Sequence, residues 1–119
     1  MKHHLTPLFS VPLYQTVLDP LDPIEESWIK NLEFPSQSVG LYKAENEEPK
    51  NAGMQVLNQP QLKNLRQQIL KVMKHFVSDV LDIEQDFELT TSWVNKNGKG
   101  DHIIQHSHPN AMISGVYYV

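Results

Sequence analysis

Two histidines, two residues apart, are the residues of this chain best suited to chemistry. His106 and His108 lie in the stretch Gln105-His106-Ser107-His108-Pro109-Asn110. Residues i and i+2 of an extended chain share one face, so both imidazoles can aim at one point, as neighbouring metal ligands must. A third ligand has to come from elsewhere. On spacing alone, the pair could also be two polar strand residues at the edge of a loop.

The bulk composition bounds the classes of function. The chain has 119 residues, 39% hydrophobic and 20% charged, which suits one globular domain. A net charge of −4 gives no electrostatic support for binding nucleic acid. The absence of cysteine excludes disulfides, thiolate zinc sites and cysteine nucleophiles and fits a cytoplasmic protein. No apolar run is long enough for a signal peptide or a membrane span, so we expect neither.

The first part of the chain, residues 1–86, is expected to be a mainly helical support. Residues 8–17 are rich in strand formers but contain Pro12, which indicates an edge strand or an extended lead-in. A helix should begin with Asp22 as its cap and Pro23 in its first position, and should end before Pro35. Residues 35–59 look like loop. The clearest pattern is an apolar stripe over 60–81, which predicts a long amphipathic helix.

In the last part, residues 87–119, the side-chain pattern repeats every two residues, as is typical of strands. Alternating side chains predict strands over 87–95, 102–108 and 112–119. Asn97-Gly98 is a strong signal for a hairpin turn between the first two strands. The two histidines fall on the second strand of this meander. We therefore treat the whole chain, 1–119, as a single domain with helices in front and strands behind.

Three segments of this part together resemble a known family, the 2-oxoglutarate and Fe(II)-dependent oxygenases of phages, cyanobacteria and other marine bacteria, which are prolyl-hydroxylase-like. The segments are Ser92-Trp93-Val94-Asn95, Gln105-His106-Ser107-His108-Pro109 and Ser114-Gly115-Val116-Tyr117-Tyr118, and the glycine-flanked turn between the first two adds to the resemblance. The resemblance covers about residues 87–119. The combination of motifs is fairly specific, whereas a His-x-His pair by itself is not.

The resemblance implies an α+β fold, in which N-terminal helices pack on a double-stranded β-helix, a jelly-roll barrel that is incomplete in this chain. It also implies Fe(II) as cofactor, with 2-oxoglutarate as co-substrate. His106 matches the first metal ligand, whereas His108 stands where the superfamily usually has a carboxylate. Tyr118 looks like the tyrosine that hydrogen-bonds a 2-oxoglutarate carboxylate, and Asn95, on an earlier strand, is expected to reach the same pocket. Tyr117 should face the opposite way and pack.

Family members also carry a distal histidine and a basic residue for 2-oxoglutarate, and neither follows these motifs here. The only arginine is Arg66, in the predicted long helix. We therefore expect a truncated dioxygenase with little or no turnover alone, acting on an unknown substrate and located in the host cytoplasm or, if phage-encoded, in a virion. The catalytic residues stay unknown.

The main alternative to the dioxygenase is a non-catalytic binding or structural module, such as a phage particle component. In that case a second copy or an assembly partner would cover the free barrel edge. A zinc hydrolase with a third ligand from the loops ranks lower.

Overall fold

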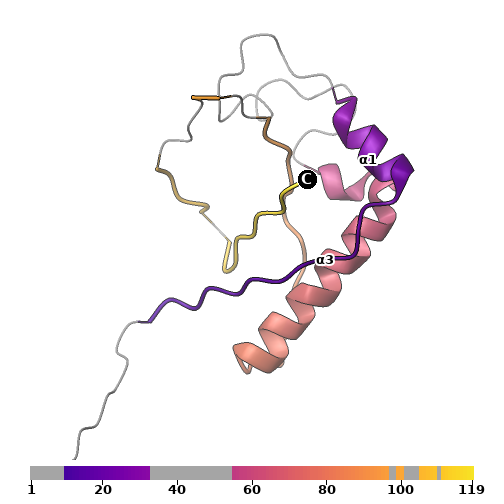
Figure 1. Ribbon diagram of the computed structural model, residues 1–119. Coiled ribbons are helices and arrows are strands. Elements are labelled where there is room, and N and C mark those ends of the chain that lie inside the picture. Colours follow the sequence, from indigo (N-terminus) through magenta and orange to yellow (C-terminus); the bar gives the residue numbers. More distant parts are fainter. Residues whose placement is uncertain (1–9, 33–54, 97–98, 101–104, 110) are drawn as a thin grey trace, which may run out of the picture.

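The computed structural model describes residues 10–32, 55–96, 99–100, 105–109 and 111–119. Its elements in chain order are the helix α1 (Pro23–Lys30), the 3-10 turns η1 (Val56–Asn58) and η2 (Pro60–Leu62), the helix α3 (Lys63–His75) and the π-helical turn η3 (Phe76–Val80). Figure 1 shows α1 and α3 together at one side of the molecule, with extended chain opposite them. Within the described ranges, no helix is long and apolar enough to cross a membrane.

Helix α1 begins as its sequence predicts. The Asp22 carboxylate accepts a hydrogen bond of 2.7 Å from the Ile24 N–H, and Pro23 occupies the first turn, where no N–H partner is required. The helix ends at Lys30, earlier than the predicted limit at Pro35. Of the predicted loop over 35–59, residues 35–54 lie outside the described residues, and the rest contains the 3-10 turn η1. The hairpin turn at Asn97-Gly98 also lies outside the described residues.

The predicted helix over 60–81 is present, but its turns are of three kinds. Pro60 opens the 3-10 turn η2, α3 follows, and η3 closes the element with a bond of 3.0 Å from the Leu81 N–H to the Phe76 carbonyl. Phe76 and Val77, the first two residues of this π turn, are both buried. Asp82 then takes a left-handed conformation, with φ of 55°, which ends the helix.

A small core joins these elements. Ile29 of α1, Val56 of η1, Leu62 of η2 and Leu65 of α3 form its buried centre. Partly buried apolar side chains pack around it: Leu18, Leu21, Trp28, Leu57, Ile69, Val94 and Tyr117. The last two come from the extended C-terminal part, which therefore rests on the helical core.

A buried carboxylate fixes α1 against α3. Glu25 is only 2% exposed, and its Oε1 accepts a hydrogen bond of 2.8 Å from the Leu65 N–H. Leu65 lies in the first turn of α3, where the backbone N–H groups have no partner within the helix. Glu25 thus caps α3 from a neighbouring helix, and its charge suits the positive end of the α3 dipole.

The residues before α1 run as extended chain along α3 (Figure 1). The Asp19 N–H donates to Gln68 Oε1 at 2.8 Å, and the Tyr14 ring stacks on Phe76 with a centroid distance of 5.4 Å. Of the two alternatives for residues 8–17, the described part is thus an extended lead-in rather than an edge strand.

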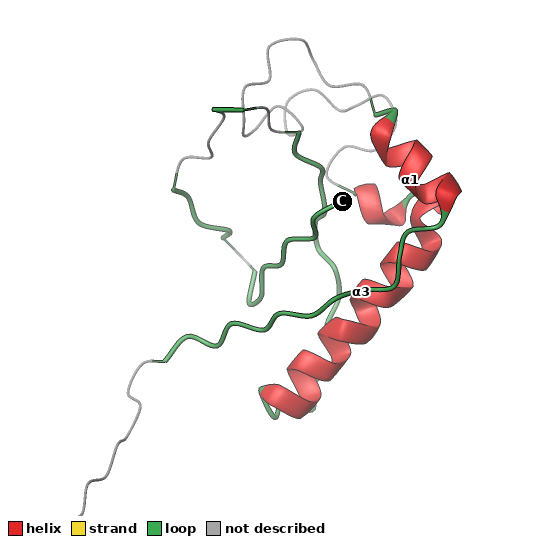
Figure 2. Ribbon diagram, in the orientation of Figure 1, coloured by secondary structure: helices red, strands yellow, loops and turns green. Residues whose placement is uncertain are grey.

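The predicted jelly-roll barrel is wrong for the part of the chain that the structure describes. Residues 87–96, 105–109 and 111–119 are drawn as extended loop without strands in Figure 2. The one isolated bridge among the described residues is parallel and joins Gln55 to Ser92. The described chain is helical with irregular extended segments, so the α+β assignment with helices packed on a β-helix is corrected.

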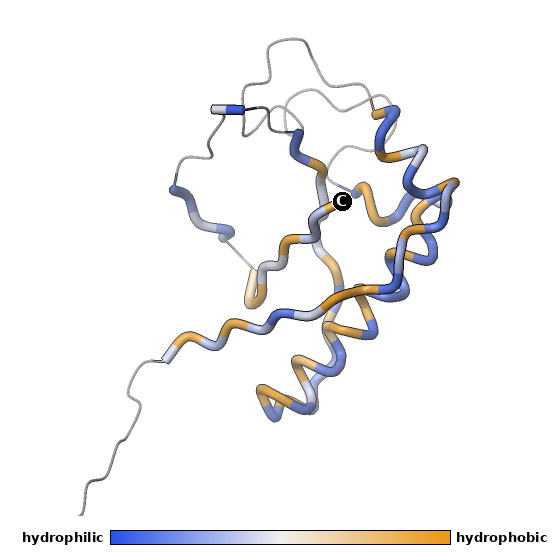
Figure 3. The backbone as a smooth tube through the Cα atoms, in the orientation of Figure 1, coloured by the Kyte–Doolittle hydropathy of each residue, from blue (hydrophilic) through white to orange (hydrophobic). Residues whose placement is uncertain are grey.

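The strands were predicted from the alternation of apolar and polar side chains, and this alternation does not require a strand. Alternation reports that every second side chain packs on something apolar, and β propensity largely measures this half-burial. In Figure 3, residues 105–109 are hydrophilic throughout, whereas 87–96 and 111–119 carry apolar residues at irregular intervals. Of the described residues in these segments, Val94 and Tyr117 pack against the helical core, whereas Trp93 packs against the His108 ring. A strand also needs a neighbouring backbone to form a ladder, and side-chain alternation carries no information about that.

We expect Glu25→Ala to lower the free energy of unfolding by about 2–3 kcal/mol, because it leaves the buried Leu65 N–H without a partner and removes a charge-assisted bond. Urea unfolding followed by circular dichroism measures this. Glu26→Ala is the matched control. Its carboxylate pairs with Lys30 on the exposed side of the same turn, where such a pair contributes less than about 1 kcal/mol. Equal losses in the two variants would contradict the capping role of Glu25.

Candidate metal site

Residues 90–94 are attached to the η1 turn by three hydrogen bonds. The Ser92 carbonyl accepts from the Val56 N–H at 2.9 Å, and the Ser92 hydroxyl accepts from the Leu57 N–H at 3.0 Å. Gln55 Nε2 donates to the Thr90 carbonyl at 2.8 Å. Because alternate residues of an extended chain point in opposite directions, Ser92 and Val94 face the helices and Trp93 faces away from them.

The two histidine side chains converge. The distance between His106 Nε2 and His108 Nε2 is 3.1 Å, and the ring centroids lie 4.8 Å apart. His106 is exposed and His108 is half-buried. The backbone over 105–108 is extended, so the i, i+2 spacing brings the rings to one side, although no strand forms there.

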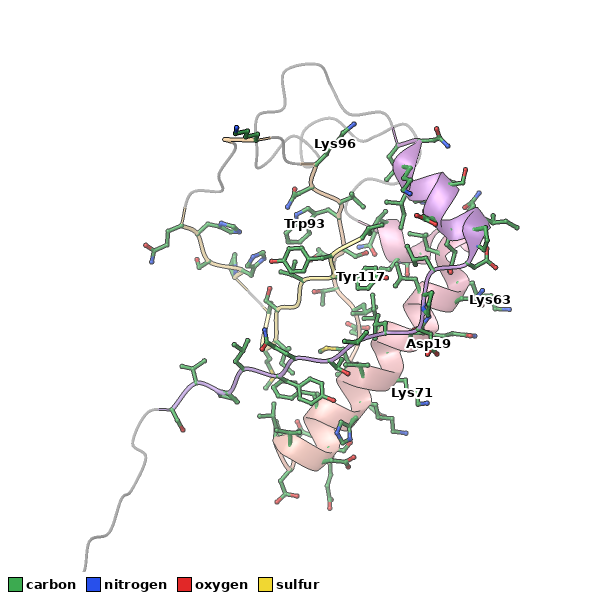
Figure 4. The ribbon with its side chains drawn as sticks, in the orientation of Figure 1. Asp19, Lys63, Lys71, Trp93, Lys96 and Tyr117 are labelled. Carbon is green, nitrogen blue, oxygen red and sulfur yellow. The ribbon has the colours of Figure 1, made fainter. Side chains whose placement is uncertain are left out.

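Trp93 holds the second imidazole. The rings of Trp93 and His108 lie nearly parallel, at an interplanar angle of 19° and a centroid distance of 5.2 Å. This is the offset-stacked arrangement that aromatic rings favour. Figure 4 labels Trp93 on its extended segment. The stack connects the histidine pair to the segment that is bonded to η1.

The distance between the two nitrogens fits ligands of one metal ion. Nitrogen ligands about 2.1 Å from a metal, at angles of about 90–110°, lie about 3.0–3.4 Å apart. The observed 3.1 Å falls in this range, and it is also the distance of a hydrogen bond between the two rings. Two imidazoles supply borderline-soft nitrogen donors suited to Fe(II), Zn(II) or Co(II). Across the described ranges, no third His, Cys, Asp or Glu completes a set with them.

The other two predicted site residues lie in exposed positions. Tyr118 is 87% exposed, and Asn95 is exposed on the segment that carries Trp93. Tyr117, its ring half-buried, packs against the core cluster. The two tyrosines therefore differ as the alternation predicts, with Tyr117 packing. The roles of Tyr118 and Asn95 toward 2-oxoglutarate, and of both histidines toward a metal, stay predictions.

Sequence reasoning missed Trp93 as a partner of the histidines. It entered only as one letter of the Ser92-Trp93-Val94-Asn95 segment. A signal was present, because a large aromatic beside a serine that faces the core must point away from that core. What the sequence lacked was the partner across the turn, since nothing in the spacing pairs position 93 with position 108.

Comparison with known families bears on the same segment. Residues 91–119 match the family model described as "Putative 2OG-Fe(II) oxygenase". The resemblance predicted from the motifs is therefore confirmed for this segment, which includes Trp93, His106, His108 and both tyrosines. No curated protein and no solved structure matches the chain.

The two neighbouring tyrosines should respond differently to truncation. We expect Tyr117→Ala to lower the free energy of unfolding by about 1–3 kcal/mol, because its half-buried ring packs on the core. Tyr118→Ala should change it by no more than about 0.5 kcal/mol, as for other exposed positions. Thermal and urea unfolding of the two variants measure the difference. A large loss in the Tyr118 variant would place that ring in the packing and remove it from the site.

Proposed function

We propose that this chain provides two metal ligands, His106 and His108, of an Fe(II)- and 2-oxoglutarate-dependent dioxygenase of unknown substrate. The convergence of the two Nε2 atoms at 3.1 Å, inside a segment that matches the oxygenase family, carries the proposal. Neither feature would be sufficient alone. Converging histidines occur in several metal enzymes, and a family match without ligand geometry says nothing about this chain's own site.

In this proposal the two imidazoles bind through Nε2 and leave Nδ1 as the atom available for outer-shell hydrogen bonds. Bound iron supplies the redox chemistry that couples decarboxylation of 2-oxoglutarate to hydroxylation of a substrate. His108 takes the place of a carboxylate, so the protein contributes less negative charge than in the usual set of two histidines and a carboxylate. Because imidazole is neutral when it ligates, the dianionic co-substrate would meet a more positive centre.

We predict that the purified protein binds Co(II), and Fe(II) under anaerobic conditions, through the histidine pair. His106→Ala and His108→Ala should each weaken binding at least about tenfold, because one remaining imidazole loses the chelate. His108→Asp should retain binding, since it restores the usual carboxylate. Calorimetric titration and the visible spectrum of bound Co(II) measure these effects.

The control for this experiment is His75→Ala. His75 pairs with Asp79 on the exposed end of the long helix and contacts the Tyr14 ring, away from the pair in the sequence. Its loss should leave Co(II) binding unchanged. Equal weakening in the His75 and His106 variants would mean that the metal binds histidines indiscriminately, which contradicts the proposal. Tight zinc retention with no effect of 2-oxoglutarate would favour a zinc hydrolase instead.

Tyr118 provides a separate test of the co-substrate. In the metal-loaded protein, we expect Tyr118→Phe to weaken 2-oxoglutarate binding about tenfold, because a hydrogen bond to a charged carboxylate is lost. The 87% exposure of Tyr118 leaves its hydroxyl accessible. Tyr117→Phe is the matched control and should bind 2-oxoglutarate as the unchanged protein does. Calorimetry with metal-loaded protein decides, and equal affinities in the two variants would exclude Tyr118 from the site.

A non-catalytic binding module is the second candidate. Two observations favour it: the described residues provide no third ligand, and the C-terminal segment exposes Met112, Val116 and Tyr118 at 89%, 76% and 87%. An apolar stretch of this kind suits a partner or a second copy of the chain. Failure of the protein to bind Fe(II) or Co(II) at all would favour this candidate. The location in a cytoplasm or a virion stays a prediction.

A further inference from the structure

Trp93 contacts the proposed site without offering a ligand atom, since an indole N–H is only a donor. Its ring is 5.2 Å from the His108 ring and nearly parallel to it. We infer that Trp93 is a positioning residue, which fixes the His108 imidazole so that its Nε2 stays beside that of His106. This inference rests on the proposed function, because it assigns a role toward the same metal.

The backbone on both sides of Trp93 is held by contacts with the helical part. Its neighbour Ser92 makes two hydrogen bonds to η1, through its carbonyl to the Val56 N–H and through its hydroxyl to the Leu57 N–H. On the other side, Val94 packs against the core cluster. The backbone of Trp93 is thus fixed at both flanks, which limits the positions that its outward ring can take.

Among the described residues, His108 has few other restraints besides Trp93. Within the described ranges, the one backbone bond of the motif is the long 3.4 Å contact from the Ala111 N–H to the His108 carbonyl. This bond holds the backbone, and the 3.1 Å hydrogen bond between His108 Nε2 and His106 Nε2 joins the two rings at one point only. The flat contact with Trp93 restrains the ring plane, and the ring plane decides where Nε2 points. Trp93, whose backbone is held against the helical core, therefore sets the orientation of the His108 ring.

The two histidines differ in how far they are buried. His108 is half-buried against Trp93, whereas His106 is exposed. Binding a metal must freeze the rotamers of both side chains, and this ordering opposes binding. Stacking on Trp93 already orders the His108 side chain in the free protein. Metal binding therefore loses less side-chain entropy at His108. Without the indole, the His108 side chain would have to be ordered when the metal binds, which should weaken binding.

The test measures Co(II) affinity in Trp93→Ala and Trp93→Phe. We expect Trp93→Ala to weaken Co(II) binding about ten- to a hundredfold, the range seen when outer-shell partners of metal ligands are removed. Trp93→Phe keeps an aromatic face and should restore affinity to within about threefold of the unchanged protein. Rescue by phenylalanine distinguishes ring stacking from a general loss of packing.

Fluorescence gives an independent measurement in a protein that keeps Trp93. The chain has two tryptophans, so Trp28→Phe leaves Trp93 as the one emitter. Co(II) should quench its emission with the same midpoint as the calorimetric titration, because the indole is stacked on a ligand. Adding His106→Ala should shift this midpoint to higher Co(II). Trp93→Phe, which leaves Trp28 in α1, should show little quenching.

The outcomes separate the two claims. If the unchanged protein binds no Co(II), the proposed function fails. If it binds Co(II) through both histidines, but Trp93→Ala binds equally well or the single Trp93 is not quenched, the positioning role alone is overturned. If Trp93→Ala fails to fold by circular dichroism, the quenching of the Trp28→Phe protein decides: a matching midpoint supports the role and unchanged emission overturns it.

Discussion

The hydrogen bonds between Ser92 and the η1 turn are the constraint on which the rest of the site depends. Among the described residues they are part of the only backbone bridge between the helical part and the C-terminal segment. They place Ser92 and Val94 toward the core and hence Trp93 away from it. The Trp93 ring then stacks on the His108 ring, and His108 Nε2 contacts His106 Nε2. A substitution that displaces η1 should therefore also displace the histidine pair.

The η1 turn is in turn positioned by the helices. Val56 is 5% exposed and belongs to the same buried cluster as Ile29, Leu62 and Leu65. The relative placement of α1 and α3 depends on Glu25, whose buried carboxylate accepts the Leu65 N–H. A chain of contacts thus runs from a polar cap inside the core, through a 3-10 turn and an extended segment, to two imidazoles on the surface. The helical part serves to hold one edge of the proposed site.

The sequence predicted the helical part well and the extended part poorly, for a physical reason. Helix signals are local: the Asp22 cap, Pro23 and the stripe over 60–81 act within a few residues, and α1 and α3 form where they indicate. The π turn at Phe76 was not foreseen, because burying two successive side chains depends on what packs there, including Tyr14 from before α1. Strands are non-local, and their ladders depend on a partner that no local pattern identifies.

The histidine pair was nevertheless placed correctly in space, although the fold around it was not. The inference that His106 and His108 face one side requires only an extended backbone, because side chains alternate there with or without a ladder. Residues 105–108 are extended, so the geometric part of the inference survives the loss of the strand. The same reasoning separated Tyr117 from Tyr118. What alternation could not supply was the contact between Trp93 and His108, since their pairing depends on the path of the chain between them, and side-chain periodicity does not encode that path.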